Sequence, residues 1–466
     1  KNLGEDREGT NENEPDFIKN MVRPIINLEE DDLPVSTYLP YDDGQYMAGT
    51  SRYEKRGIAL FVPEWNIDNC IQCNQCSYIC PHATIRPFLL DEEQKAKAPE
   101  GFETKKAIGK GLEGYEFRIQ VSPYDCMGCG NCVDVCPAPK KALAMKPIDE
   151  QIEKQADNWE YAHGEVGYRN DEIAPTNVKN SQFSQPLLEF SGACAGCGET
   201  PYAKLITQLY GDHQIISNAT GCSSIWGSSV PSMPYCTNKN GEGPAWASSL
   251  FEDAAEYGYG MLLATKSNKF LLETLMKKFL ELKVSTPLND AFNEWLENND
   301  DFEESKKAAI KIESLIANET DNDEANKIIE RIKSLKDYLV KKSVWIYGGD
   351  GWAYDIGFSG VDHVLASGDD INIIVFDTEV YSNTGGQSSK ATPLAAVAKF
   401  AASGKKVRKK DLGLMMTTYG YVYVAQVAMG ANQAQTLKAI KEAESYHGPS
   451  LIIAYAPCIN HGLKAG

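Results

Sequence analysis

Apolar runs alternate with amphipathic helical patterns over the second half of the chain. Five of these runs have the length and composition of buried strands: 214–217, 344–347, 371–377, 421–424 and 451–456. Strand-like runs separated by helical patterns are typical of a parallel sheet with helices on both faces. We therefore expect a doubly wound α/β domain, in which ligands bind where the strands end at their carboxyl edge.

A different pattern interrupts this alternation at about residues 266–342. The stretch is long and charged, and its apolar residues recur at helical spacing, as in Phe270, Leu271, Leu275 and Phe279. Such spacing places apolar side chains on one face of each helix. We expect several helices inserted as a subdomain. A helix that binds a partner is the alternative, although amphipathic helices usually cover their own core.

Composition shifts divide the rest of the chain. Residues 1–36 are acidic and lack periodic apolar positions, which indicates a linker or strap. Residues 37–150 hold eight of the thirteen cysteines, and the polar, irregular segment 151–186 indicates a second linker. The α/β domain then occupies residues 187–466. A stretch rich in Lys, Glu and Gly, 91–114, separates the two halves of the cysteine-rich part, and we expect it to form a surface excursion.

Charge and cysteine usage restrict the partners and the compartment. The chain carries 46 Lys and Arg against 65 Asp and Glu, a formal net charge of -19. This charge disfavours nucleic acid and anionic membranes as partners, although it is explained equally well by solubility. No apolar stretch reaches the roughly 18 to 20 residues that cross a bilayer, and no signal segment opens the sequence. Because cluster-type cysteines belong in a reducing compartment, we expect a cytoplasmic protein.

Two copies of one cysteine pattern give the strongest chemical signal. They are Cys70-x2-Cys73-x2-Cys76-x3-Cys80-Pro81 and Cys126-x2-Cys129-x2-Cys132-x3-Cys136-Pro137. In two-cluster ferredoxins the fourth cysteine of each run ligates the other 4Fe-4S cluster. We therefore assign Cys70, Cys73, Cys76 and Cys136 to one cluster, and Cys126, Cys129, Cys132 and Cys80 to the second. Zinc motifs do not explain the third cysteine and the proline of each copy.

Five further cysteines remain: Cys194, Cys197, Cys222, Cys236 and Cys458. The first two form a Cys-x2-Cys pair in a glycine-rich loop, which suits a redox dithiol, half a zinc site or half a third cluster. Cys222 and Cys458 follow strand-like runs and so belong at one edge of the sheet. Spacing alone does not select four ligands from these five.

Two strand ends carry a possible magnesium site. The run 344–347 leads into Gly349-Asp350-Gly351, and the next strand ends at Asp377-Thr378. A diphosphate on Mg²⁺ needs oxygen donors, which these ends supply together. The arrangement is typical of thiamine diphosphate sites, except that Asp377-Thr378 stands where many families carry Asn-Asn.

Several longer motifs resemble those of the pyruvate:ferredoxin (flavodoxin) oxidoreductases. They lie at 70–76, 194–202, 221–224, 349–357, 377–387 and 457–461. The resemblance covers the chain from about Pro34 onwards. It implies that Cys194, Cys197, Cys222 and Cys458 hold a third 4Fe-4S cluster, which leaves Cys236 as a free cysteine. It also implies that Asp350, Thr378 and the Val380 carbonyl hold Mg²⁺.

The same resemblance implies a coenzyme site and its reaction. Thiamine diphosphate would be lined by Glu199, Cys222, Gly349, Asp350, Gly351, Trp352, Thr378, Glu379, Val380, Tyr381, Ser382 and Asn383, with Glu199 and Asn383 as catalytic residues. The expected reaction converts pyruvate and coenzyme A to acetyl-CoA and CO2, and electrons pass through three clusters to ferredoxin or flavodoxin. In this family, which is expected to form homodimers, an N-terminal half activates the coenzyme and binds the substrate, so this chain resembles the carboxyl-side portion.

Two alternatives remain open. One is an oxidoreductase for another 2-oxo acid, such as 2-oxoglutarate. The other is a non-catalytic carrier of electrons with two clusters and an unrelated fused domain.

Overall fold

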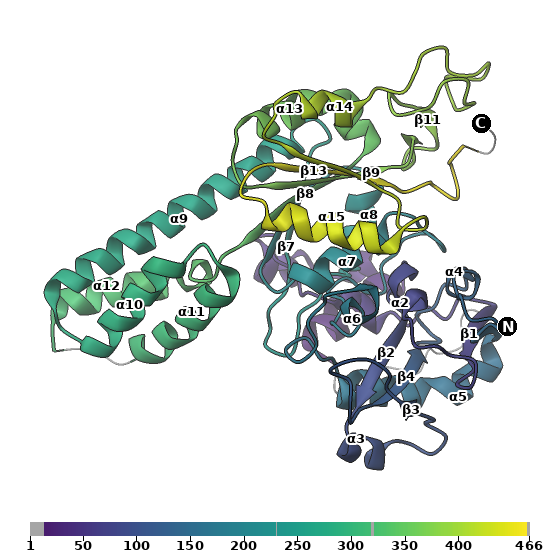
Figure 1. The fold of residues 1–466 in the computed structure, drawn as a ribbon, viewed down its shortest axis with the longest axis horizontal. Coiled ribbons are helices and arrows are strands. Elements are labelled where there is room, and N and C mark those ends of the chain that lie inside the picture. Colours follow the sequence, from purple (N-terminus) through teal and green to yellow (C-terminus); the bar gives the residue numbers. More distant parts are fainter. Residues whose placement is uncertain (1–13, 230, 318–320, 464–466) are drawn as a thin grey trace.

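The fold has three main parts, which Figure 1 shows as a sheet domain, a cysteine-rich domain beside it and a helical arm that extends away from both. The structure is a computed structural model and describes residues 14–229, 231–317 and 321–463. Within these residues, no helix combines the length and apolarity that crossing a membrane requires.

The sheet has six strands, all parallel, in the order β12-β13-β9-β8-β6-β7. Their bounds are β6 Gln214–Ala219, β7 Ala245–Ser249, β8 Ser343–Gly349, β9 Asn372–Asp377, β12 Tyr423–Val427 and β13 Ser450–Tyr455. Five of them correspond to the apolar runs of the sequence. The edge strand β7 has no counterpart in the prediction.

Helices cover both faces of this sheet. On one face, α7 (Thr200–Tyr210), α8 (Cys222–Gly227) and α15 (Gln433–Ser445) share an apolar core with the strands. On the other, α13 (Phe358–Ala366), α14 (Leu412–Thr417) and the start of α9 (Ala254–Leu282) close a second core. Successive residues of a strand alternate between the two cores, for example Val344 and Trp345. The doubly wound architecture is therefore confirmed.

The helical arm is formed by the rest of α9 together with α10 (Thr286–Asn298), α11 (Phe302–Ile316) and α12 (Asp323–Lys333). Their apolar faces meet in a core of their own. The helical region begins at Ala254, earlier than the expected 266, because the first turns of α9 pack on the sheet. Gly258 permits this contact, since a Cβ there would lie 2.5 Å from Ile346.

The cysteine-rich domain is built from two antiparallel sheets and two short helices. Strand β1 (Phe61–Trp65) pairs with β5 (Leu143–Pro147), and β2 (Ile85–Leu90) and β3 (Lys105–Lys106) both pair with β4 (Glu116–Val121). The helices are α2 (Gln75–Ile79) and α4 (Asn131–Asp134). The excursion 91–114 carries α3 (Glu92–Lys97) and β3.

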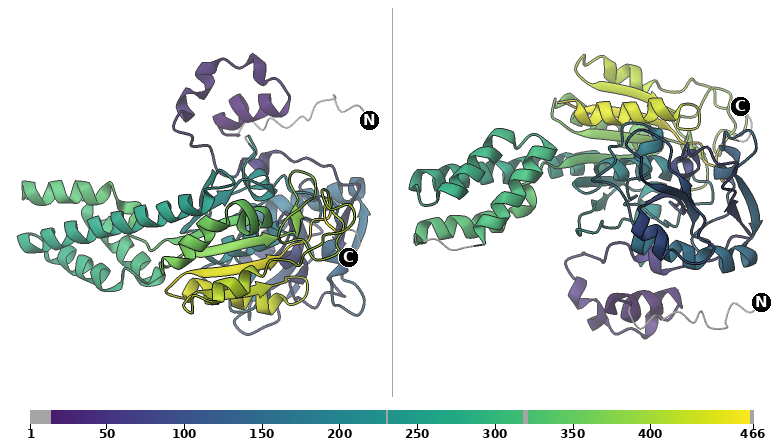
Figure 2. Two further views of the ribbon diagram at one scale, coloured as in Figure 1. Left: turned by 90° about the horizontal axis from the view of Figure 1, so that it is seen from above. Right: turned by 60° about the horizontal axis from the view of Figure 1, so that its bottom comes forward.

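Two segments that we expected to be linkers contain regular structure. The segment from 151 starts inside α5 (Ile148–Tyr161), which packs on β1, β4 and β5 and is followed by η5 (Ala162–Val166) and α6 (Val178–Ser181). Near the N-terminus, residues 18–41 form η1 (Ile18–Val22), α1 (Arg23–Ile26), η2 (Glu30–Asp32) and η3 (Val35–Tyr41). Figure 2 shows this part standing apart from the sheet domain. Residues 1–13 lie outside the described residues.

Candidate active site

The first cysteine set surrounds one cavity, which we call the first cavity. Cys70, Cys73, Cys76 and Cys136 line it together with Trp65, Ile119 and Leu143. Burial raises the pKa of the Cys76 thiol. In this arrangement Cys136 of the second repeat lies with three cysteines of the first repeat, as in the crossed assignment made from the sequence.

The second set surrounds a second cavity. Cys80, Cys126, Cys129 and Cys132 line it, with Pro63, Thr84 and Met145. Burial raises the pKa of Cys126 to about 12. Burial also acts to raise the pKa of Cys80, but the nearby Lys204 and a hydrogen bond with Thr84 outweigh it, so the net shift is downward. Helix α2 separates the two cavities, with Cys76 inside the helix and Cys80 as its C-cap.

These sets suit iron–sulfur clusters in their donor chemistry and spread. Four cysteine sulfurs are the ligands of a 4Fe-4S cluster. Among the residues that the structure describes, no group of three or more His, Cys, Asp or Glu side chains is placed to hold a single metal ion. Each set of four thiols lines one cavity.

The third cysteine group is drawn from three loops at the carboxyl edge of the sheet. Asn460 Nδ2 donates to Cys194 Sγ at 2.9 Å. The backbone at Gly198 lies against Pro457, since a Cβ on Gly198 would be 3.0 Å from the Pro457 oxygen. Burial, Glu199 and the thiols of Cys197 and Cys458 all raise the pKa of Cys222. The loops that carry Cys194, Cys197, Cys222 and Cys458 therefore lie together.

Cys236 lies elsewhere. It is 2% exposed, and its thiol lies 3.7 Å from the Pro186 carbonyl oxygen. Its electrostatic neighbours are Glu189, Arg52 and Arg86, so it lies apart from the third cysteine group.

The proposed magnesium ligands are in mutual contact where β8 and β9 end. Thr378 Oγ1 lies 2.8 Å from Asp350 Oδ1 and 2.9 Å from the Val380 carbonyl oxygen. Asp350 is 1% exposed, and burial raises its pKa to about 7. Sequence reasoning missed Ser389, whose hydroxyl donates to Asp350 Oδ2 at 2.5 Å. Carboxylate, hydroxyl and carbonyl oxygens are the donors that Mg²⁺ prefers, so the residues fit this ion.

The glycines of the Gly-Asp-Gly motif allow close packing around this centre. A Cβ on Gly351 would lie 2.5 Å from the Tyr381 ring, so any larger residue would displace it. Gly349 ends β8, and η7 (Gly351–Ile356) follows Asp350. Trp352 is fully buried, and its Nε1 has no hydrogen-bond partner. The side chain of Trp352 thus belongs to the core.

The segment after β9 connects the magnesium ligands to the third cysteine group. Glu379 has a left-handed backbone, with φ of 64°, and its side chain pairs with Lys409 at 3.1 Å. Ser382 Oγ lies 3.3 Å from Cys222 Sγ, and Asn383 Oδ1 lies 4.0 Å from the same sulfur. His461 Nδ1 is 2.7 Å from the Ser382 carbonyl oxygen, a contact that the sequence did not reveal.

Glu199 is a buried carboxyl in the same region. It is 4% exposed and accepts a hydrogen bond of 2.7 Å from Trp226 Nε1. Burial raises its pKa to about 7, despite that hydrogen bond. A carboxyl with such a pKa can accept or donate a proton near neutral pH.

The third cysteine group adjoins the second cavity. A Cβ on Gly196 would lie 3.6 Å from Cys129 Cβ, so the two ligand loops touch. His82, two residues after Cys80, has Nε2 2.8 Å from the Ala193 carbonyl oxygen, beside Cys194. The second cavity therefore lies between the third cysteine group and the first cavity.

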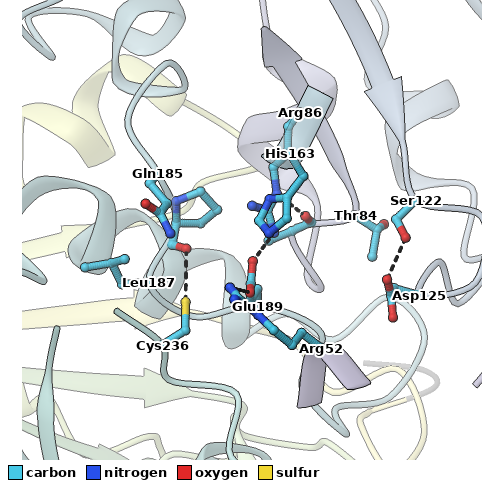
Figure 3. Close-up of polar contacts among 12 residues, drawn as sticks. Arg52, Thr84, Arg86, Ser122, Asp125, His163, Gln185, Leu187, Glu189 and Cys236 are labelled. Carbon is cyan, nitrogen blue, oxygen red and sulfur yellow. Dashed lines mark hydrogen bonds and ion pairs between the residues drawn. The ribbon is translucent and has the colours of Figure 1, made fainter. Parts of the chain in front are cut away.

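A buried ion-pair network holds the two domains in this position (Figure 3). Glu189 is fully buried and pairs with Arg86 of β2 at 2.6 Å and with Arg52 at 2.9 Å. The paired arginines hold the pKa of Glu189 at about 2 against the effect of burial. Arg52 and Arg86 belong to the cysteine-rich part and Glu189 to the start of the sheet domain, so the network links these two parts.

Three family models match parts of the chain. A 4Fe-4S dicluster domain matches residues 69–140, and the thiamine pyrophosphate enzyme C-terminal TPP binding domain matches residues 333–454. A domain of unknown function, named EKR, matches residues 4–59. With the fold, these matches show a 4Fe-4S dicluster domain joined to a domain of the thiamine pyrophosphate enzyme C-terminal type.

The chain is homologous, over 97% of its length, to the pyruvate:ferredoxin and pyruvate-flavodoxin oxidoreductases. It is 58% identical over 453 residues to the pyruvate:ferredoxin oxidoreductase of Moorella thermoacetica and 56% identical over 452 residues to the pyruvate-flavodoxin oxidoreductase of Klebsiella pneumoniae. It spans 38% of the length of each of these relatives.

A more distant solved structure is the 2-oxoglutarate:ferredoxin oxidoreductase of Magnetococcus marinus. It has 15% sequence identity and a TM-score of 0.36, and the match covers 65% of this chain and 72% of that one.

Proposed function

We propose that this chain is the electron-transferring and diphosphate-binding part of an enzyme that oxidises pyruvate with coenzyme A and passes electrons to ferredoxin or flavodoxin. The observation that carries the proposal is the contact between Cys222 and Ser382. It puts a proposed cluster ligand against the segment that follows the proposed magnesium ligands. A redox centre beside a thiamine site has the position needed to collect electrons from it.

Each cofactor has residues of suitable chemistry. Three groups of four cysteines would hold three 4Fe-4S clusters, and Asp350, Thr378 and the Val380 carbonyl would hold Mg²⁺ and hence the diphosphate. Thiamine diphosphate supplies an electron sink for the decarboxylation of a 2-oxo acid.

Two residues are proposed for the reacting end of the coenzyme. Glu199 is buried beside Trp226, and its pKa of about 7 suits it to hold or release a proton at Oε1 or Oε2. Asn383 is exposed next to Cys222, where its amide can orient a reacting group. Both roles depend on geometry that the bound substrate completes.

The proposed electron route follows the adjacency of the ligand loops. Clusters held by the three cysteine groups would relay electrons from the third group to the second cavity across the Gly196–Cys129 contact, and from there to the first cavity across α2.

Iron and sulfide analysis after anaerobic reconstitution tests the cofactor content, with about twelve iron atoms per chain expected for three cubanes. Turnover is then assayed in the full-length protein with pyruvate, coenzyme A and a viologen dye. Faster dye reduction with 2-oxoglutarate than with pyruvate would show that the substrate is another 2-oxo acid. If the clusters assemble but thiamine diphosphate does not bind, the proposal is reduced to an electron carrier without catalytic activity.

A further inference from the structure

Lys204 is a buried cation that enters the cysteine-rich domain from the sheet domain. It lies on α7, seven positions after Cys197 of the third cysteine group, and it is 2% exposed. Its Nζ donates to the carbonyl oxygen of Tyr78 at 3.1 Å and also to that of Ser77. Both carbonyls belong to α2, the helix between the two cavities.

Within the part of the chain that the structure describes, the groups that shift the pKa of Lys204 include two thiols and no carboxylate. Its electrostatic neighbours are Cys80, Arg86 and Cys76. Arg86 has its own partner, since it pairs with Glu189. A buried ammonium needs an anionic partner to offset the loss of hydration. Two carbonyl dipoles accept from two of its three N–H donors, but the negative charge must come from the cysteine side.

The two thiols near Lys204 belong to different cavities. Cys76 lines the first cavity and Cys80 lines the second. A cluster held by four thiolates is anionic, and it gains one further negative charge when it accepts an electron. Reduction potentials of such clusters depend on nearby charge and on solvent exposure. A cation held without solvent between two clusters therefore acts on both.

We propose that the ammonium of Lys204 raises the reduction potentials of the clusters in the first and second cavities together. The charge favours the reduced form of each cluster and makes both better acceptors for electrons from the third cysteine group. This inference rests on the proposed function, because it requires both clusters. It adds a positioning residue that binds no cofactor and comes from the opposite domain.

The test replaces Lys204 in the holoprotein and follows each cluster by redox titration with electron paramagnetic resonance. In Lys204→Met the chain length and most of the packing volume remain, but the charge is lost. We expect the equilibrium constant for reduction of each of the two clusters to fall at least tenfold, which is a midpoint about 59 mV lower for a one-electron couple. Lys204→Arg should restore both midpoints.

Lys179 provides a matched control. It is partly exposed, and its electrostatic neighbours are Cys70 and Cys73 of the first cavity. Because solvent screens its charge, Lys179→Met should produce a smaller shift, confined to the first cluster. The cluster of the third cysteine group serves as an internal reference in every variant.

Iron content separates the possible outcomes. If wild-type protein holds no clusters in these cavities, the proposed function fails before Lys204 is tested. If Lys204→Met retains its iron but both midpoints stay at their wild-type values, the inference is overturned. It is also overturned if Lys204→Met and Lys204→Gln both lose the clusters while Lys204→Arg fails to restore them, because Lys204 would then serve assembly alone.

Discussion

Replacing Asp350 by asparagine removes the one carboxylate among the three proposed magnesium ligands while keeping the shape of the side chain. The amide can still bond with the hydroxyls of Thr378 and Ser389, which now contact the two carboxylate oxygens. The fold around β8 should therefore remain. The bound cation would lose the anionic protein oxygen that offsets its charge.

The size of the effect follows from the burial of Asp350. The residue is 1% exposed, so solvent does not replace a lost charge there. Removing one partner of a buried ion pair costs about 3–5 kcal/mol. At about 1.4 kcal/mol per factor of ten, the Kd for thiamine diphosphate with Mg²⁺ should rise by two to more than three powers of ten.

The dependence on pH gives a second signature. Burial raises the pKa of Asp350 to about 7, and the metal requires the deprotonated carboxylate. In wild type, affinity for the magnesium coenzyme should therefore fall about tenfold for each pH unit below 7. Asp350→Asn should lack this dependence.

Calorimetric titration of thiamine diphosphate with Mg²⁺ into the full-length protein measures both effects. The matched control is Glu444→Gln. Glu444 also has a pKa of about 7 through burial, but it bonds Ser343 at the opposite end of β8. Its replacement should leave the affinity unchanged. An Asp350→Asn protein that binds the coenzyme as tightly as wild type would refute the assignment of this carboxylate.

Three further predictions concern the clusters, the half-buried carboxyl of Glu444 and the competence of the chain on its own. Cys458→Ser should lose about four iron atoms, whereas Cys236→Ser should lose none; equal iron contents would remove Cys458 from the third cluster. Folding raises the pKa of Glu444 from 4.5 to about 7, so its stabilising contribution is present below about pH 4.5 and is lost as the pH rises through 7. Glu444→Gln should therefore become more stable than wild type, by up to about 3 kcal/mol, between pH 5 and 8. The gain should appear as a pH-dependent difference in Tm. Residues 1–466 alone should accept electrons from dithionite but should not decarboxylate pyruvate unless the remaining part of the enzyme is supplied; equal rates with and without that part would contradict this division of labour.

The sequence predicted the elements whose burial leaves a clear apolar pattern. Central strands such as β9 are buried on both faces and appear as continuous apolar runs. The edge strand β7 has the sequence Ala-Trp-Ala-Ser-Ser, which gives no such run. Helix α5 escaped prediction because its buried face carries Gln151, Gln155 and Asn158 beside Trp159. Hydrogen bonds satisfy these amides, for example the bond from Gln155 to the Pro63 carbonyl oxygen. The polar face of α5 can therefore be buried.

The site was predictable where spacing along the chain fixes the chemistry. The two cysteine repeats specify both cavities, since each needs three residues of one repeat and the last residue of the other. Ser389 was missed because it reaches Asp350 only through the folding back of the segment after β9. Lys204 gave no signal either, because a lysine within an apolar helix reveals its surroundings only when the opposite domain is in place.

The crossing of ligands between the two repeats also has a consequence for biosynthesis. Cys80 leaves its own repeat for the second cavity, and Cys136 returns to the first. Neither cavity has all four of its thiols until the second repeat has been translated and has folded onto the first. Insertion of iron and sulfide during synthesis must therefore wait for about 60 residues beyond Cys76 to leave the ribosome, and closing such a long loop is slow compared with local folding. A nascent chain stalled between the repeats would expose three of the four thiols of the first cavity. Oxidants could modify these thiols, or stray metal ions could bind them, before a cluster is inserted.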